Sequence, residues 1–369
     1  MPLSKNSTPS GWNLSVGDWV EVRSKEEILA TLDENGCIDG MPFMPEMLAF
    51  AGRRFPVFRR AHKTCDTVNK TGGRRVADAV HLADLRCNGA AHGGCEADCL
   101  LFWKTQWLRR IDGPEGGNPR SLGSVAAATG VTEAGLLAAT RAGGSDADPV
   151  FKCQATQLPA ATSPLKWWNI RQYIEDVTSG NESIVHIVRS AFYAGAYQVI
   201  EASRRRPRAQ RLLISLYDRF QKIFGGMPYP RKEGRVPAGE ITPERKLDLV
   251  PGEIVRVRSY EEILGTLDKA NKNRGLYFGD EEVPYCGKAL RVRSRVTRII
   301  DERSGKMIPI RGGSVILEGA WCKGYYSDRR LHCPRAIFTF WRETWLERIE
   351  HTGDARVAGP GGQQRESDG

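Results

Sequence analysis

The chain has 369 residues, of which 40% are hydrophobic and 27% are charged, and its formal net charge is +10. These proportions are those of a soluble globular protein, and no segment offers the roughly 18 uninterrupted apolar residues that a membrane-spanning helix needs. The first residues also lack the apolar run of a signal peptide, so we expect a cytoplasmic protein with two or three domains.

An internal repeat organises the chain. The segment "GDWVEVRSKEEILATLD" at residues 17–33 returns as "GEIVRVRSYEEILGTLD" at residues 252–268, with twelve identities in seventeen positions. The offset of 235 residues holds as far as Cys87 and Cys322; after a three-residue insertion, Cys95 aligns with Cys333. Repeats of this length indicate a duplicated structural unit. We therefore predict a first copy at residues 15–112 and a second copy at residues 231–350.

Each copy has the pattern of a small sheet. After residues 1–14, which we expect to be disordered, "WVEVR" alternates apolar and polar residues as a half-buried strand does. Ser24 and Glu27 then form a capping box that opens a short helix, and Ser259 and Glu262 do the same in the second copy. The copy ends in "CLLFWKTQWLRRI", where tryptophans recur at helical spacing, and we expect a closing helix there. The predicted fold class is α+β, with two homologous SH3-like β-barrel modules that are each closed by a C-terminal helix.

Between the copies the composition changes. Residues 113–149 are rich in Gly, Ala and Ser, which predicts a flexible linker. Residues 150–230 show helical spacing, interrupted by the basic segment "RRRPRAQR" from Arg204 to Arg211. This segment could bind nucleic acid or an anionic membrane surface. In the second copy "LRVRSRVTRII" and "KMIPI" predict a hairpin, and the polar tail at residues 351–369 is expected to be disordered.

The chain resembles a bacterial protein family with one or two cysteine-rich, SH3-like modules and no established activity. The segments that carry the resemblance are "MPFMPEML", "HGGCEADCLLFWK", "KCQATQL", "VPYCG" and "FWRETWLERI", so it covers most of the chain. The resemblance supports the module boundaries, but the family has no established activity that could be transferred to this chain.

Four cysteines of the first copy form the most specific chemical signal. Disulfides are disfavoured in the cytoplasm, so clustered thiols point to metal binding. Cys65 and Cys87 are predicted on strands, whereas Cys95 and Cys99 are expected on one face of the closing helix. A helix N-terminus favours thiolates and lowers their pKa. We therefore predict one metal centre, held by Cys65, Cys87, Cys95 and Cys99.

A second site is predicted less directly. Ile300 aligns with Cys65 and Ile337 aligns with Cys99, so the second copy lacks two of the ligands. Cys153 lies just after the linker and is assigned to this site by elimination. The predicted ligands of the second site are Cys153, Cys286, Cys322 and Cys333. Cys37 remains and is expected to be a buried core residue.

The metal is expected to be zinc or an iron–sulfur cluster, one per module. Tetrahedral four-cysteine sites suit zinc, which we prefer because it is the commoner choice. The sequence has no C-x2-C pair of the kind found in zinc ribbons, and iron–sulfur clusters accept looser spacing. His62, His92 and His332 lie close to these cysteines in the sequence and could replace a ligand.

The function expected from these features is that of a metal-binding, double-module protein that acts as a binding or assembly factor for a protein partner. No Walker A motif, dinucleotide fingerprint, nucleophile elbow or HExxH motif occurs, which argues against an enzyme. One alternative is an iron–sulfur electron-transfer or redox accessory protein that serves a partner oxidoreductase. A second alternative is a nucleic-acid-binding protein that uses the basic surface.

Overall fold

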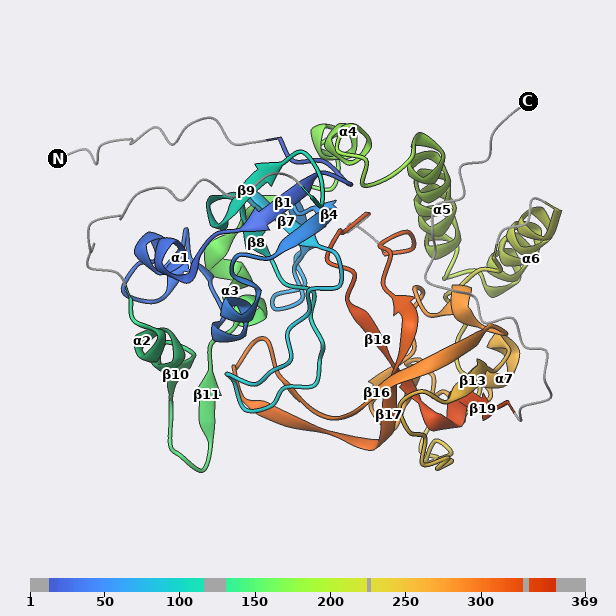
Figure 1. Cartoon of the computed structure of the whole chain (residues 1–369). Helices are drawn as coiled ribbons and strands as arrows, with labels where there is room; N and C mark the ends of the chain where they lie inside the picture. Colours follow the sequence, from blue (N-terminus) through green and yellow to red (C-terminus); the bar gives the residue numbers. More distant parts are fainter. Residues whose placement is uncertain (1–12, 116–130, 224–226, 328–331, 350–369) are drawn as a thin grey trace. The chain divides into compact units, whose positions relative to one another are not determined.

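The structure, a computed structural model, describes residues 13–115, 131–223, 227–327 and 332–349 (Figure 1). The chain divides into two compact units. Unit 1 lies within Met1–Val188, Ile300–Ile308 and Asp328–Ala336, and unit 2 lies within Arg189–Ile299, Pro309–Ser327 and Ile337–Gly369. Two segments of the second copy therefore belong to unit 1. Apart from residues 13 and 14, the ends predicted to be disordered fall outside the described residues.

The first copy builds a five-stranded antiparallel sheet in the order β8-β7-β4-β1-β9. Its strands are β1 (Trp19–Val22), β4 (Arg54–Arg60), β7 (Ala79–Leu82), β8 (Trp103–Lys104) and β9 (Leu108–Ile111). Val20 of β1 pairs with Phe55 of β4 on one side and with Arg110 of β9 on the other. Helix α1 (Lys25–Thr31) begins at the predicted capping box of Ser24 and Glu27.

The second copy builds a sheet of the same topology, in the order β18-β17-β16-β13-β19. Its strands are β13 (Ile254–Val257), β16 (Ala289–Ile300), β17 (Met307–Trp321), β18 (Phe338–Arg342) and β19 (Leu346–Arg348). Val255 pairs with Leu290 and Arg348, which are the positions equivalent to those around Val20. Helix α7 (Tyr260–Leu264) begins at a capping box of Ser259 and Glu262. The sequence repeat thus corresponds to a repeated sheet topology.

The predicted SH3-like barrels are wrong. The fold is mixed α/β with several antiparallel sheets, and no closed barrel is found in the part of the chain that the structure describes. The predicted closing helices are wrong as well. In the first copy, β8 is followed by the 3-10 turn η2 (Thr105–Trp107) and by β9. In the second copy, β18, η4 (Glu343–Trp345) and β19 take the same places.

The paired tryptophans explain why the closing segments resemble helices in the sequence. Trp103 and Trp107 both pack edge-on against Phe43, with ring centroids 6.1 and 5.0 Å away. A short strand followed by one 3-10 turn brings residues four apart to the same side of the core, as a helix would. Trp341 and Trp345 pack against Phe278 in the same way, at 6.1 and 5.1 Å.

Smaller elements complete the two units. Short ladders are formed by β2 (Cys37–Ile38) with β3 (Met41–Pro42), β5 (Lys63–Cys65) with β6 (Gly73–Arg75) and β12 (Ser163–Leu165), β10 (Arg141–Gly144) with β11 (Pro149–Phe151), and β14 (Lys272–Asn273) with β15 (Leu276–Tyr277). The remaining helices are η1 (Pro45–Phe50), α2 (Glu133–Ala138), α3 (Gln154–Ala161), α4 (Arg171–Thr178), α5 (Ile184–Ala202), α6 (Pro207–Ile223) and η3 (Val283–Tyr285). Of the predicted linker, residues 116–130 fall outside the described residues, and the part that follows contains α2 and β10. Within the described residues, no helix combines the length and apolar character needed to cross a membrane.

Candidate metal centre

One long loop of unit 1, residues 83–102, carries three of the four ligands predicted for the first site. It joins β7 to β8, and a single bridge between Arg86 and Leu100 folds it back on itself. The N–H of Cys87 donates to the carbonyl of Cys99 at 2.8 Å, so the two cysteines lie side by side at the neck of the loop. Gly89 allows the turn that follows, because its φ of +70° is a left-handed conformation that other residues rarely adopt.

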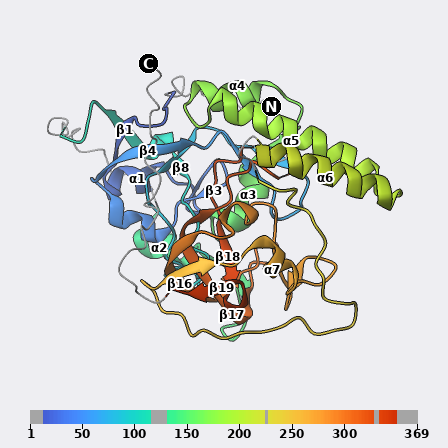
Figure 2. The same ribbon diagram turned by 90° about the vertical axis from the view of Figure 1, so that its right-hand side faces the viewer.

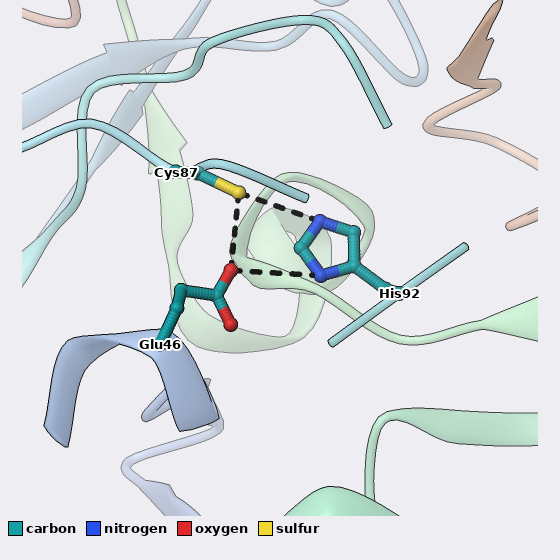
Figure 3. Close-up of side chains that lie close together, drawn as sticks. All are labelled: Glu46, Cys87 and His92. Atoms are coloured by element: carbon teal, nitrogen blue, oxygen red, sulfur yellow. Dashed lines mark hydrogen bonds and ion pairs between the residues drawn. The ribbon is translucent and has the colours of Figure 1, made fainter. Parts of the chain in front are cut away.

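Three donor groups converge at this loop. Glu46 of η1 reaches it from the first-copy core, and its Oε1 lies 3.2 Å from Cys87 Sγ (Figure 3). His92 Nε2 lies 3.4 Å from the same sulfur, and His92 Nδ1 lies 3.7 Å from Glu46 Oε1. These three ligand atoms lie within 4.8 Å of one another. Among the described residues, no other trio of His, Cys, Asp or Glu side chains meets that condition.

The polar atoms of this trio are not all satisfied by the protein. The side chains of His92 and Glu46 are only 2% and 5% exposed. Within the described residues, His92 Nδ1 and Glu46 Oε2 have no hydrogen-bond partner. Burial lowers the pKa of His92, against the effect of Glu46, so the imidazole is held neutral. A buried carboxylate beside a neutral imidazole and a thiol is an arrangement that a cation would stabilise.

Cys87 also lines a small cavity together with three other thiols. The cavity has a volume of about 40 Å³, and Cys87, Cys95, Cys99 and Cys153 all face it. We call this the thiol cavity. Because no three of these sulfurs lie within 4.8 Å of one another, they are spaced more widely than four ligands of one tetrahedral ion.

Burial keeps these thiols protonated when no cation is bound. Burial raises the pKa of Cys87 and that of Cys95. It also raises the pKa of Cys153 to about 11 and that of Cys99 to about 12, although Arg335 acts to lower the pKa of Cys99. The predicted helix N-terminus, which would lower these pKa values, is absent because Cys95 and Cys99 lie in irregular loop. Buried thiols of high pKa are poor nucleophiles, and each of them would have to lose its proton before it could bind a metal ion.

The wall of the thiol cavity includes residues from α3 and from the second copy. Cys153 is the N-cap residue of α3. The side chain of the next residue, Gln154, accepts a hydrogen bond from the N–H of Phe102 at 2.8 Å and donates one to the carbonyl of Phe102 at 2.9 Å. Arg335 is 2% exposed and donates to Glu302 at 2.7 Å and to Thr67 at 3.0 Å. Burial alone would lower the pKa of Arg335, but Glu302, Cys65 and Cys99 together raise it. A permanent positive charge therefore lies at the cavity.

The structure distributes the eight predicted ligands unevenly. Of the first set, three line the thiol cavity, whereas Cys65 lies on β5 as predicted and donates its N–H to the sulfur of Cys333 at 3.2 Å. Of the second set, Cys153 faces the thiol cavity and Cys333 lies beside Cys65, all within unit 1. Cys286 and Cys322 belong to unit 2. The N–H of Cys322 donates to the carbonyl of Ile337 at 2.8 Å. This bond repeats the one between Cys87 and Cys99, with isoleucine in place of the second thiol.

Two residues of the site could not be found from the sequence. Glu46 is one acidic residue inside the apolar segment "MPFMPEML", and nothing in its spacing relates it to the cysteines. Gln154 follows Cys153 directly and has no pattern of its own. Of the histidines considered as ligands, His92 contributes to the trio, whereas His62 lies 3.3 Å from Asp176 and His332 packs against Tyr173.

Comparison with known proteins adds no family to this description. No protein-family model matches the chain, and no curated protein matches it.

Proposed function

We propose that this protein is a cytoplasmic metal-binding protein whose centre is built on Glu46, Cys87 and His92. The observation that carries the proposal is the convergence of three donor atoms within 4.8 Å. Two of these side chains, those of Glu46 and His92, each have a buried polar atom without a hydrogen-bond partner among the described residues. Cysteine, histidine and glutamate together are typical ligands of zinc. A divalent ion would balance the negative charges of a thiolate and a carboxylate.

The role of such a centre would be to fix the loop against the core. Glu46 lies on η1, whose neighbours Met47 and Leu48 are buried in the first-copy core, whereas Cys87 and His92 lie on the loop. Binding would also lower the pKa of Cys87, because a cation stabilises the thiolate. A loop held in this way presents a defined surface, which suits a binding or assembly factor better than an enzyme.

The metal content of the purified protein tests this proposal. The full chain is purified without metal-affinity chromatography, and its zinc is measured by mass spectrometry. We expect about one zinc per chain, lost in Glu46→Gln, Cys87→Ser and His92→Ala. Cys37→Ser is the matched control, because Cys37 is also buried but does not line the thiol cavity. Wild-type protein without metal, or full zinc occupancy in the three variants, would overturn the proposal.

A specific observation favours a second candidate, an iron–sulfur protein that serves a redox partner. Four thiols face one cavity at separations wider than a single tetrahedral ion requires. In a [4Fe–4S] cluster each thiolate binds a different iron, so wider spacing is expected. The buried guanidinium of Arg335 at the same cavity would offset the negative charge of a cluster with four thiolates.

Cys153 separates the two candidates, because it faces the thiol cavity but is not part of the trio. Protein purified without oxygen is assayed for colour, iron and sulfide. If an iron–sulfur cluster is bound, Cys153→Ser should lose iron and sulfide, and Glu46→Gln should keep them. If zinc is bound by the trio, the protein is colourless. In that case Cys153→Ser should keep its zinc, and Glu46→Gln should lose it.

A further inference from the structure

Helices α5 and α6 form a hairpin with its own small core. From Arg189 onward both helices belong to unit 2, and Figure 2 shows them running beside one another. Tyr193 of α5 and Tyr217 of α6 face each other with ring centroids 6.5 Å apart, and Tyr229 packs against Tyr217 at 5.7 Å. These tyrosines are at most 6% exposed. The inner face of the hairpin is therefore already occupied.

A different face of the hairpin exposes large apolar side chains. On α6 they recur every three or four residues, which places them in one stripe along the helix. The stripe consists of Leu212, Leu216, Phe220 and Ile223, which are 42% to 72% exposed. On α5, Phe192 and Val199 are 49% and 58% exposed. The rings of Phe192 and Phe220 lie 5.3 Å apart, so the apolar residues of the two helices form one continuous patch.

Positive charge flanks this apolar patch. Residues 189–223 contain eight arginines and lysines and two acidic residues, a net charge of +6. On α6 the cations recur at a spacing that places them along one side of the apolar stripe. They are Arg208, Arg211, Arg219 and Lys222, and all four are exposed. The turn between the helices adds the exposed residues Arg204, Arg205 and Arg206.

We propose that the α5–α6 hairpin docks this protein on the surface of an anionic lipid bilayer. Helices that lie in the membrane interface combine an apolar stripe with Lys and Arg on the polar side, as α6 does. The apolar side chains enter the boundary between headgroups and acyl chains, and the cations remain among the lipid phosphates. A nucleic acid would use the cations but not the apolar stripe. A second copy of the hairpin would bring two faces of the same charge together, which is unfavourable.

Vesicle co-sedimentation of the full chain tests this proposal. Vesicles of phosphatidylcholine that contain phosphatidylglycerol are compared with vesicles of phosphatidylcholine alone. We expect binding to the anionic vesicles, weakening as salt is raised. Leu216→Gln with Phe220→Gln should weaken binding roughly tenfold or more, because less apolar surface is buried. Leu137→Gln is the matched control, because Leu137 is 52% exposed on α2 and lies outside the hairpin.

The charge contribution is tested by a second pair of variants. Arg205→Gln with Arg206→Gln should weaken binding several-fold and reduce its salt dependence. Arg245→Gln with Lys246→Gln removes two exposed cations elsewhere in unit 2 and should leave binding unchanged. Circular dichroism of each variant confirms that it is folded.

Three results would overturn the proposal. The first is equal binding, or none, to both kinds of vesicle. The second is a dimer in solution that Leu216→Gln with Phe220→Gln converts to a monomer, which would identify a second copy as the occupant of the patch. The third is tight binding of single-stranded RNA that depends on Arg205 and Arg206 but not on the apolar residues.

Discussion

The sulfur of Cys333 accepts a hydrogen bond from the N–H of Cys65 at 3.2 Å, although the two residues belong to different copies of the repeat. The equivalent bond exists in the opposite direction: the sulfur of Cys95 accepts from the N–H of Ile300 at 3.3 Å. Cys95 aligns with Cys333, and Cys65 aligns with Ile300. Each copy thus supplies a sulfur acceptor to the other copy within unit 1. The two copies thus make reciprocal contacts, as the two subunits of a symmetric dimer do.

Arg335 should contribute more than any other single residue to the stability of this contact between the two copies. It is 2% exposed and connects Glu302 with Thr67 of the first copy. Replacing it by alanine leaves a partly buried carboxylate without its partner, and we expect a loss of about 3–5 kcal/mol in the free energy of unfolding. Denaturant unfolding measures this loss. Arg204→Ala is the control, since Arg204 pairs with Glu201 on the surface. An equal loss of unfolding free energy in the two variants would show that the buried ion pair stabilises the protein no more than an exposed one.

A second buried ion pair should hold α4 on the first copy. Lys63 Nζ lies 2.5 Å from Asp176 Oδ2, and the two side chains are 4% and 0% exposed. Burial lowers the pKa of Lys63, although Asp176 opposes this effect. We expect Asp176→Ala to cost about 3–5 kcal/mol, because the lysine is left buried and unpaired. Glu175→Ala, which breaks a more exposed pair with Arg75, should cost less than about 1 kcal/mol in the same unfolding experiment. Similar costs for both variants would contradict this interpretation.

Local signals in the sequence predicted the parts of the fold that depend on local physics. The capping boxes at Ser24 and Ser259, the strands that precede them and the hairpin of β16 and β17 were all predictable, because each rests on residues close in the chain. The segments after Cys95 and Ile337 were predicted wrongly as helices. Their tryptophans have helical spacing, but they face the core across a strand and a 3-10 turn, and tertiary packing decides between these structures.

The candidate site was predictable only in part for a related reason. The clustering of Cys87, Cys95 and Cys99 in the sequence placed three predicted ligands in one loop, and these residues line one cavity. Glu46 and Cys153 reach the same place from elsewhere in the chain, and only the tertiary fold brings them there. Assignment by elimination placed Cys153 with cysteines of the second copy, since sequence alone cannot say which loop faces the start of α3.

Gly89 should be essential to the shape of the loop at residues 83–102. A Cβ atom at this position would lie 2.1 Å from the carbonyl oxygen and 2.5 Å from the nitrogen of Cys95. At Gly52, which has a similar φ of +72°, a Cβ atom meets nothing within 4 Å. Both alanine variants carry the strain of a left-handed conformation, about 1–2 kcal/mol. Gly89→Ala should cost roughly 1–3 kcal/mol more, because backbone atoms must move.

The two glycine variants are compared by thermal unfolding and metal content. We expect Gly89→Ala to lose both stability and metal, and Gly52→Ala to lose a little stability only. If the two variants retain equal amounts of metal, the conformation of residues 87–95 is not what positions the proposed ligands.

His81 should make the stability of unit 1 depend on pH. Its side chain is fully buried, and Nδ1 lies 2.9 Å from the carbonyl oxygen of Leu101. Burial lowers the pKa of His81 from 6.5 to about 3, the Leu101 carbonyl opposes this shift, and the positive charges of Arg335, Arg59 and Arg86 add to it. Between these two pKa values the unfolded chain binds a proton at this site and the folded chain does not. The contribution is therefore complete above about pH 6.5 and is lost as the pH falls toward 3.

The variant His81→Asn isolates this effect, since its amide can still donate to Leu101 but does not titrate in this range. It should be less stable than the wild type at every pH, because the ring that packs against Phe102 is lost. The informative quantity is the slope of the unfolding free energy between pH 4 and 6. In the variant this slope should be smaller by up to about 1.4 kcal/mol per pH unit, which corresponds to one proton fewer taken up on unfolding. Parallel curves for the two proteins would mean that His81 is already protonated in the folded state or that its pKa is unchanged by folding.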